Sequence, residues 1–321
     1  MMLTSLRRLV ALAAPIALGA WFGGVTAQTP RPVTLLSEVR AAIAAHDLSR
    51  ADALVAMQRR EKGATPEVLE ALSWLARGAQ SEGQRDRADA YASEAQRLAV
   101  AALAGRAVDA DPQLAAAISN GIEVQAQIAA ARNERSEAIA FLERELRTYR
   151  DTSLSKRIQK NINLLTLEGH PAPALEQSEW IGAPPPLLTD LKGKVVVLFF
   201  WAHWCPDCKI QGPILATLRD RYRSQGLAIV APTQRYGYVA RGAAASPAEE
   251  LRYIVQVRDE YYPFLADLPV PVSVTDHQRY GVSSTPTVVI LDRQGIVRLY
   301  HPGRMTETEL ETHLRGLLDA H

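Results

Sequence analysis

The stretch KVVVLFFWAHWCPDC, residues 194–208, contains the clearest structural pattern in the sequence. Its first part, Lys194 to Trp201, is a continuous apolar run rich in β-branched and aromatic residues, which predicts a strand buried on both faces. Helical character begins at Lys209, so two cysteines lie where a strand ends and a helix begins. Because further candidate strands and helices alternate after this stretch, we expect an α/β sheet covered on both sides.

The other elements of this C-terminal half follow from the same patterns. Strands are expected at Leu227 to Pro232, Thr287 to Asp292 and Ile296 to Tyr300, and helices at Lys209 to Gln225, Pro247 to Tyr262 and Glu307 to Ala320. Proline-rich and glycine-containing turns flank residues 170–186, which are therefore predicted to be a linker or an edge hairpin. The α/β domain is expected over residues 187–321.

Cys205 and Cys208 are the only cysteines in the chain, which excludes a structural disulfide framework. At a helix start, backbone N–H groups and the positive end of the helix dipole stabilise a thiolate on the first cysteine. The two-residue spacing lets the second cysteine form a short disulfide with it. We therefore assign Cys205 as the attacking thiolate and Cys208 as the resolving thiol, with Pro206 restraining the turn.

Two other uses of the cysteine pair fit the sequence less well. Zinc requires four ligands and the chain has no second pair, so no metal site is expected, and His203 is predicted to be a rim residue. Peroxide reduction would need a threonine or serine three residues before the first cysteine, and that position is Ala202.

Residues 34–167 are rich in Ala, Leu, Glu, Arg and Gln, with apolar residues three and four apart, which predicts helices. Three similar turns, at residues 46–51, 83–88 and 133–138, are each expected to join two helices. The alanine at the sixth position of each turn permits close packing of the second helix on the first. The His, Gly or Asn at the first position suits a helix end in the left-handed conformation. These turns resemble tetratricopeptide turns, although their spacing is irregular. We predict an all-α, TPR-like helical-hairpin domain over residues 28–169, with an ordinary helical bundle as the alternative.

The chain begins with a basic pair at residues 7–8, an apolar run over residues 9–22 and small residues up to Ala27. This order predicts a signal peptide over residues 1–27, an uncleaved membrane anchor being the alternative. The expected product starts near Gln28, has no stable membrane span and is periplasmic or secreted. With a formal net charge of +1, no global field attracts nucleic acid or an anionic membrane.

Three segments, residues 191–194, 200–208 and 284–287, resemble the TlpA/ResA-type branch of the thioredoxin family, and the resemblance covers residues 180–320. It implies a thioredoxin-like fold with an insertion around residues 233–275. It also implies that Pro286 is cis and faces the disulfide, while the backbone of Thr285 pairs with bound substrate. Trp204 and Pro206 are expected to belong to the same substrate-binding surface. Tyr236, Tyr238 and Tyr253 of the insertion fit packing, surface or contact roles equally well.

Two positions depart from the family pattern. Thioredoxins often place a buried acid six residues before the first cysteine, where this chain has Phe199. ResA-like proteins have a glutamate three residues after the second cysteine, where this chain has Gln211. The proton acceptor for Cys208 is therefore open between water, Glu249 and Asp259.

The residues around the cysteines indicate a direction of electron flow. Asp207 disfavours a thiolate at Cys205, and Lys209 partly offsets it, so these two residues are assigned to tuning the thiol. We expect a thiol-disulfide oxidoreductase that is more a reductant than an oxidant, without a cofactor beyond its own disulfide. Its partners would be client proteins with disulfides or thiols and an unidentified electron donor. The alternative is an adaptor, in which the helical repeats bind a partner and the thioredoxin-like domain is a docking module.

Overall fold

The structure is a computed structural model that describes residues 34–319. The predicted signal peptide and the last residue of the predicted C-terminal helix, Ala320, lie outside the described residues. Within residues 34–319, no helix combines the length and the apolar character that a bilayer span requires.

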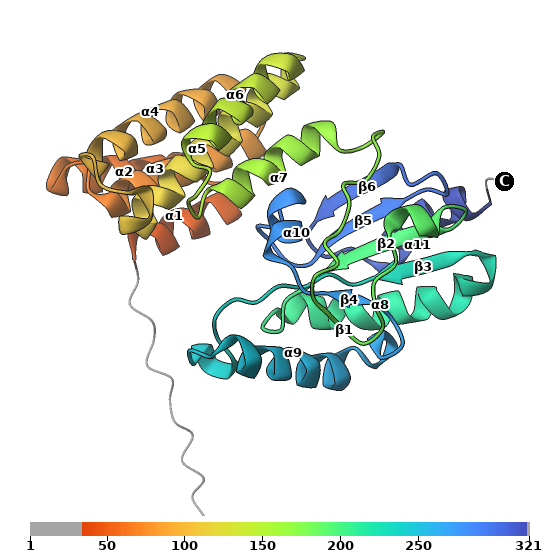
Figure 1. The fold of residues 1–321 in the computed structure, drawn as a ribbon. Helices are drawn as coiled ribbons and strands as arrows, with labels where there is room; N and C mark the ends of the chain where they lie inside the picture. The colour runs from red at the N-terminus through yellow and green to blue at the C-terminus, as the bar shows by residue number, and fades with distance from the viewer. Residues whose placement is uncertain (1–33, 320–321) are drawn as a thin grey trace, which may run out of the picture. The chain divides into compact units, whose positions relative to one another are not determined.

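The N-terminal part of the described chain consists of helices, as predicted (Figure 1). They are α1 (Leu35–Ala44), α2 (Leu48–Lys62), α3 (Pro66–Ser81), α4 (Arg85–Leu103), α5 (Pro112–Ala131), α6 (Arg135–Thr148) and α7 (Ser155–Thr166), with a 3₁₀ turn at Val108–Ala110. Thr65 and Asp111 cap α3 and α5 through their side chains, each followed by a proline in the first turn.

The three similar turns of this part adopt one conformation. His46, Gly83 and Asn133 at their first place all have a positive φ, between 57° and 74°. The alanines at the sixth place, which are Ala51, Ala88 and Ala138, are fully buried. The small side chain therefore allows close helix packing at each turn, as the sequence predicts.

The helices form two layers. α1 contacts α3, α3 contacts α5, and α5 contacts α7, while α2, α4 and α6 lie between successive members of that series on the other side. We refer to α1, α3, α5 and α7 as the inner layer. Its helices contact one another in sequence, and they pack against one another more closely than the helices of the other layer do.

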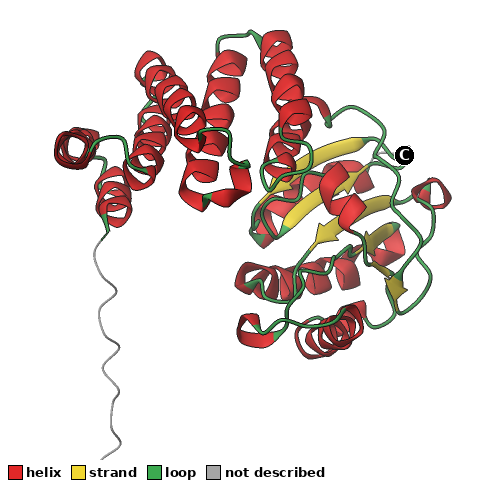
Figure 2. Cartoon of the chain, turned by 60° about the vertical axis from the view of Figure 1, so that its left-hand side comes forward, coloured by secondary structure: helices red, strands yellow, loops and turns green. Residues whose placement is uncertain are grey.

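The C-terminal part is an α/β unit with a four-stranded sheet in the order β3-β2-β5-β6. The sheet consists of β2 (Val195–Phe200), β3 (Leu227–Val230), β5 (Thr287–Leu291) and β6 (Val297–Pro302), and β1 (Trp180–Ile181) pairs with β4 (Val270–Pro271). The helices are α8 (Pro206–Tyr222), α9 (Pro247–Tyr261), α10 (Val274–Arg279) and α11 (Glu307–Leu318). Short 3₁₀ turns lie at Leu188–Leu191, Arg223–Gln225, Ala240–Gly242 and Pro263–Leu265. Figure 2 shows the strands between helices on both sides.

Strand β2 is buried on both faces, as its unbroken apolar run predicts. It pairs in parallel with β3 and antiparallel with β5. Val195, Val197 and Phe199 pack in the core with α8, α9 and α11, whereas the alternate residues face a second core that contains Tyr280. The predicted helix from Lys209 begins three residues earlier, at Pro206, because Cys205 takes the N-cap position.

The segment over residues 170–186 forms two backbone pairings outside the four-stranded sheet. Pro171 forms an isolated bridge with Ile296, and β1 pairs with the distant β4 rather than within a local hairpin. The edge-hairpin alternative is therefore wrong, because β4 from the far end of the insertion supplies the partner backbone.

Helix α7 packs closely on the α/β unit beside α10. Gln278 Nε2 donates to Ser155 Oγ at 2.8 Å, and Asn163 Nδ2 donates to the carbonyl of Arg279 at 3.2 Å. Gly281 has a φ of +59°, and a Cβ built there would lie 2.3 Å from the backbone nitrogen of Lys160. Glycine at 281 therefore permits both the turn after α10 and the close approach of α7.

His277 on α10 makes the stability of this core dependent on pH. The side chain is fully buried, with Nδ1 3.0 Å from the carbonyl oxygen of Ser273 and the ring edge-on to Phe200. Burial lowers the pKa of His277 to about 3. In the unfolded chain a histidine has a pKa of about 6.5. Between about pH 6.5 and about 3, His277 therefore binds a proton in the unfolded chain but not in the folded one. The free energy of unfolding consequently falls as the pH drops below about 6.5.

We predict that His277→Phe makes the free energy of unfolding less dependent on pH. Between about pH 6.5 and 4.5 the wild-type protein should lose roughly 1.4 kcal/mol per pH unit relative to the variant. Urea unfolding of both proteins over a pH series measures this difference. Parallel pH profiles would show that His277 does not titrate in this way.

Candidate functional site

The two cysteines lie at the beginning of α8, just after the end of β2. Cys205 is the N-cap residue, Pro206 occupies the first turn, and Cys205 forms a disulfide with Cys208. The backbone N–H of Cys208 donates to Cys205 Sγ at 3.0 Å. This contact is the one expected to stabilise a thiolate on Cys205 after reduction of the disulfide.

Thr285 and Pro286, which precede β5, face the disulfide. The peptide bond between them is cis, as the family resemblance implies. The carbonyl oxygen of Thr285 lies 3.3 Å from Cys205 Sγ. Pro286 is buried and Thr285 is half-buried, so the structure brings this backbone and the disulfide together although they are far apart in sequence.

Trp204, Pro206 and Asp207 surround the disulfide on the exposed side. Trp204 is 47% exposed, and Pro206 and Asp207 are also exposed. Cys205 itself is buried, so a partner's sulfur has to approach it past these side chains. Lys209 Nζ lies 3.4 Å from the centre of the Tyr261 ring, an arrangement that directs its charge towards the end of α9.

His203 is not a rim residue, and this prediction was wrong. Its side chain is 1% exposed, and Nε2 lies 3.2 Å from Oε1 of the equally buried Glu250 on α9. The same carboxylate accepts hydrogen bonds from the backbone N–H groups of Tyr236 and Gly237. Burial lowers the pKa of His203, although Glu250 acts in the opposite direction.

The tyrosines of the insertion pack around His203. The rings of Tyr236, Tyr238 and Tyr253 lie edge-on to the imidazole, with centroids 5.3 to 5.5 Å away. Tyr236 also contacts the exposed Trp204 ring at 5.5 Å. We call Trp204, Tyr236, Tyr238 and Tyr253 the aromatic wall. It joins the insertion to the residue that precedes Cys205.

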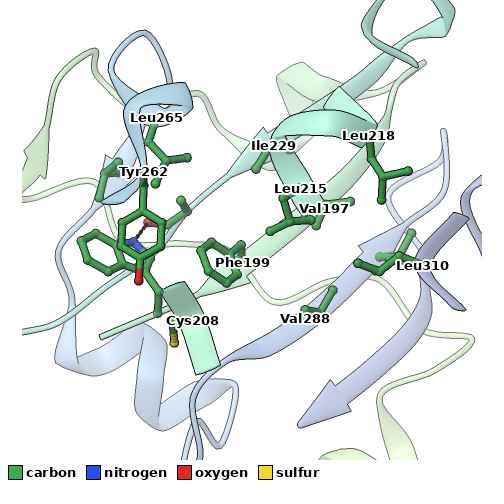
Figure 3. Packing of buried hydrophobic residues seen from close by; sticks show 14 of the residues in the cluster. Val197, Phe199, Cys208, Leu215, Leu218, Ile229, Tyr262, Leu265, Val288 and Leu310 are labelled. Atoms are coloured by element: carbon green, nitrogen blue, oxygen red, sulfur yellow. Dashed lines mark hydrogen bonds between the residues drawn. The ribbon is translucent and has the colours of Figure 1, made fainter. Parts of the chain in front are cut away.

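The side of Cys208 that faces the core is apolar. Phe199 and Tyr262 lie beside it in the same core cluster, with their ring centroids 6.1 Å apart (Figure 3). Gln211 is buried, and its Oε1 accepts from the backbone N–H of Met305 at 2.8 Å. Cys208 is therefore closed off from solvent on this side.

Neither carboxylate considered as proton acceptor is directed to Cys208. Glu249 is exposed and belongs to the capping box of α9, where it accepts from Ser246. Asp259 is exposed and pairs with Arg258. The structure therefore does not support these two candidates. Water remains the proposed acceptor.

The fold and the site together define a thiol-disulfide oxidoreductase with a thioredoxin-like domain. The Redoxin family model matches residues 168–315. Thioredoxin-like protein YneN of Bacillus subtilis (strain 168) is 34% identical over 127 residues, which cover 40% of this chain and 67% of that protein. Thiol-disulfide oxidoreductase ResA of Bacillus thuringiensis (strain Al Hakam) is 30% identical over 134 residues, with the same coverage.

The chain belongs to this ResA/YneN group, the TlpA/ResA-type thioredoxin-like family. It is a protein-disulfide oxidoreductase, and this family implies thiol-bearing substrate proteins. Among solved structures, a putative thiol:disulfide interchange protein DsbE from Chlorobium tepidum is 25% identical, with a TM-score of 0.36. That comparison covers 47% of this chain and 97% of the other.

Proposed function

We propose that this oxidoreductase reduces disulfides of exported client proteins through Cys205 and Cys208. The observation that carries the proposal is the position of Cys205, at the N-cap of α8 and 3.3 Å from the carbonyl oxygen of Thr285. A nucleophilic sulfur is thereby placed next to backbone that can pair with an extended client segment. The export of the chain and a periplasmic or secreted location are part of the proposal and rest on the first 27 residues.

The reaction needs no group beyond the two cysteines and a dithiol donor. In the reduced enzyme, the Cys205 thiolate attacks one sulfur of the client disulfide, and the other client sulfur leaves as a thiolate that takes up a proton. Cys208 then loses its proton and attacks Cys205 Sγ, which releases the second client thiol. Two electrons have moved to the client, and the donor must reduce the Cys205–Cys208 disulfide before the next cycle.

The side chains around the disulfide have different roles in this proposal. Thr285 offers its backbone to the client segment, and Pro286 keeps that backbone against the disulfide. Trp204 and Pro206 form the exposed contact surface beside Cys205. Asp207 lies in the first turn of α8. Its negative charge offsets the positive potential of the helix N-terminus at Cys205 and so disfavours the thiolate. A less stable thiolate makes the dithiol form a better electron donor, which supports the reductant direction.

We predict that Asp207→His makes the reduction potential of the couple more positive. The change removes a negative charge and introduces a group that can be positive next to the thiolate, so a shift of roughly 30 mV or more is expected. Equilibration with glutathione buffers followed by trapping of free thiols measures it. Asp220→His, an exposed change near the other end of α8, is the matched control. An unchanged potential in Asp207→His would remove the electrostatic argument for direction.

A further inference from the structure

Four charged side chains meet on the inner layer of the helical part. Glu123 on α5 is buried and accepts from Arg77 of α3 at 3.2 Å, Arg157 of α7 at 3.0 Å and Lys160 of α7 at 2.9 Å. Three cations thus share one carboxylate. The whole chain has a formal net charge of only +1, so this cluster is a local concentration of positive charge.

The cations retain hydrogen-bonding capacity beyond Glu123. The guanidinium groups of Arg77 and Arg157 both donate to Asn120 Oδ1 as well as to Glu123, which uses part of the five N–H donors that each possesses. The two side chains are 33% and 30% exposed. Burial lowers the pKa of Arg77, although Glu123 acts against this.

The positive charge continues towards the disulfide. Lys156 lies one turn before Lys160 on α7, and its Nζ donates to Gln234 Oε1 at 2.9 Å. Gln234 is two residues before Tyr236, whose ring contacts Trp204 next to Cys205. We call Arg77, Arg157, Lys160 and Lys156 the basic surface. At one end of it, Lys156 contacts Gln234, two residues before Tyr236 of the aromatic wall.

We propose that the basic surface binds an acidic segment of the client protein and thereby holds the client's cysteine near Cys205. This inference rests on the proposed function, because it assigns a substrate class to the same site. Charge complementarity favours an acidic segment as the ligand. Carboxylates of an extended chain can accept hydrogen bonds from the remaining N–H donors of Arg77 and Arg157, in bidentate pairs. Because α3, α5 and α7 contact one another in sequence, the inner layer brings these cations together.

The first test measures binding of a short fluorescein-labelled peptide that alternates acidic residues with serine, by fluorescence anisotropy at physiological ionic strength. Arg77→Gln/Arg157→Gln should weaken binding at least about tenfold, because two cations are lost while Lys160 still neutralises Glu123. Arg60→Gln/Arg97→Gln, two exposed arginines outside the inner layer, is the matched control and should bind as the wild type does. Arg77→Lys/Arg157→Lys keeps both charges but cannot form bidentate pairs, so its affinity should lie between those of the wild type and the glutamine variant.

A second probe covers the case in which the glutamine variant does not fold. The same peptide with Asn and Gln in place of its acids should bind the wild-type protein at least about tenfold more weakly. Equal binding of the two peptides, no binding of the acidic one, or unchanged binding by a folded glutamine variant would each overturn the inference.

Turnover separates this inference from the proposed function. An acidic segment joined to a disulfide peptide should lower its KM at least about fivefold, with kcat unchanged, because the segment adds binding outside the reacting atoms. Reduction of the neutral disulfide peptide by the wild-type protein tests the proposed function alone. Turnover of both peptides with equal KM would refute the basic surface and leave the oxidoreductase intact.

Discussion

Cys205→Ser is expected to reduce the catalysis of insulin reduction by dithiothreitol to the uncatalysed rate. Serine keeps the N-cap position of α8 but has no sulfur that can form a mixed disulfide. The turbidity of precipitating insulin chains measures the rate directly. Cys208→Ser is the informative partner variant, since it keeps the attacking sulfur and lacks the resolving one. It should accumulate a mixed disulfide with the client that Cys205→Ser cannot form.

The same variant tests whether the biological role depends on the redox chemistry or on an adaptor function. An adaptor that docks partners through its two domains would keep its biological role without either sulfur, whereas an oxidoreductase would lose it with Cys205. Full insulin reduction by folded Cys205→Ser would contradict the assignment of the attacking thiolate. A variant that fails in the assay and still performs the cellular role would favour the adaptor.

Gly281→Ala is expected to cost roughly 2–4 kcal/mol of unfolding free energy. The residue has a φ of +59°, and its new Cβ would lie 2.3 Å and 2.6 Å from the backbone nitrogen and Cα of Lys160. Backbone atoms of α7 cannot move aside as a flexible side chain can, so the contact between α7 and the α/β unit has to open. Urea unfolding compares the variant with the wild type.

Gly295→Ala provides the control for Gly281→Ala. Gly295 also has a positive φ, +82°, but a Cβ there would meet no atom within 4 Å. Its cost should be that of the backbone conformation alone, about 1 kcal/mol. Similar costs for the two variants would show that the packing of α7 against residue 281 contributes little to stability.

The local features of this protein could be predicted from its sequence. Strand β2 and the start of α8 follow from an apolar run and a cysteine motif that are continuous in the chain, so neighbouring residues determine them. The left-handed residues His46, Gly83 and Asn133 follow from short turns for the same reason. Family resemblance added Thr285 and Pro286, which no local pattern connects to the cysteines.

The long-range contacts could not be predicted in this way. The insertion folds back so that Glu250, 47 residues after His203, packs against that histidine. No periodic pattern in the sequence indicates that these two residues pair. The pairing of β1 with β4 likewise joins segments at opposite ends of a long stretch. Arg77 and Glu123 lie 46 residues apart on different helices, and each alone is an ordinary charged residue of an amphipathic sequence.

The reduction potential of the Cys205–Cys208 couple determines whether this enzyme can reduce client disulfides. The mature protein is equilibrated with glutathione or dithiothreitol buffers, and its free thiols are trapped and counted. We expect a potential near that of thioredoxin, about −270 mV, as a reductant of client disulfides requires. A potential near about −120 mV, typical of a strong oxidant, would contradict it and make this protein an enzyme that introduces disulfides.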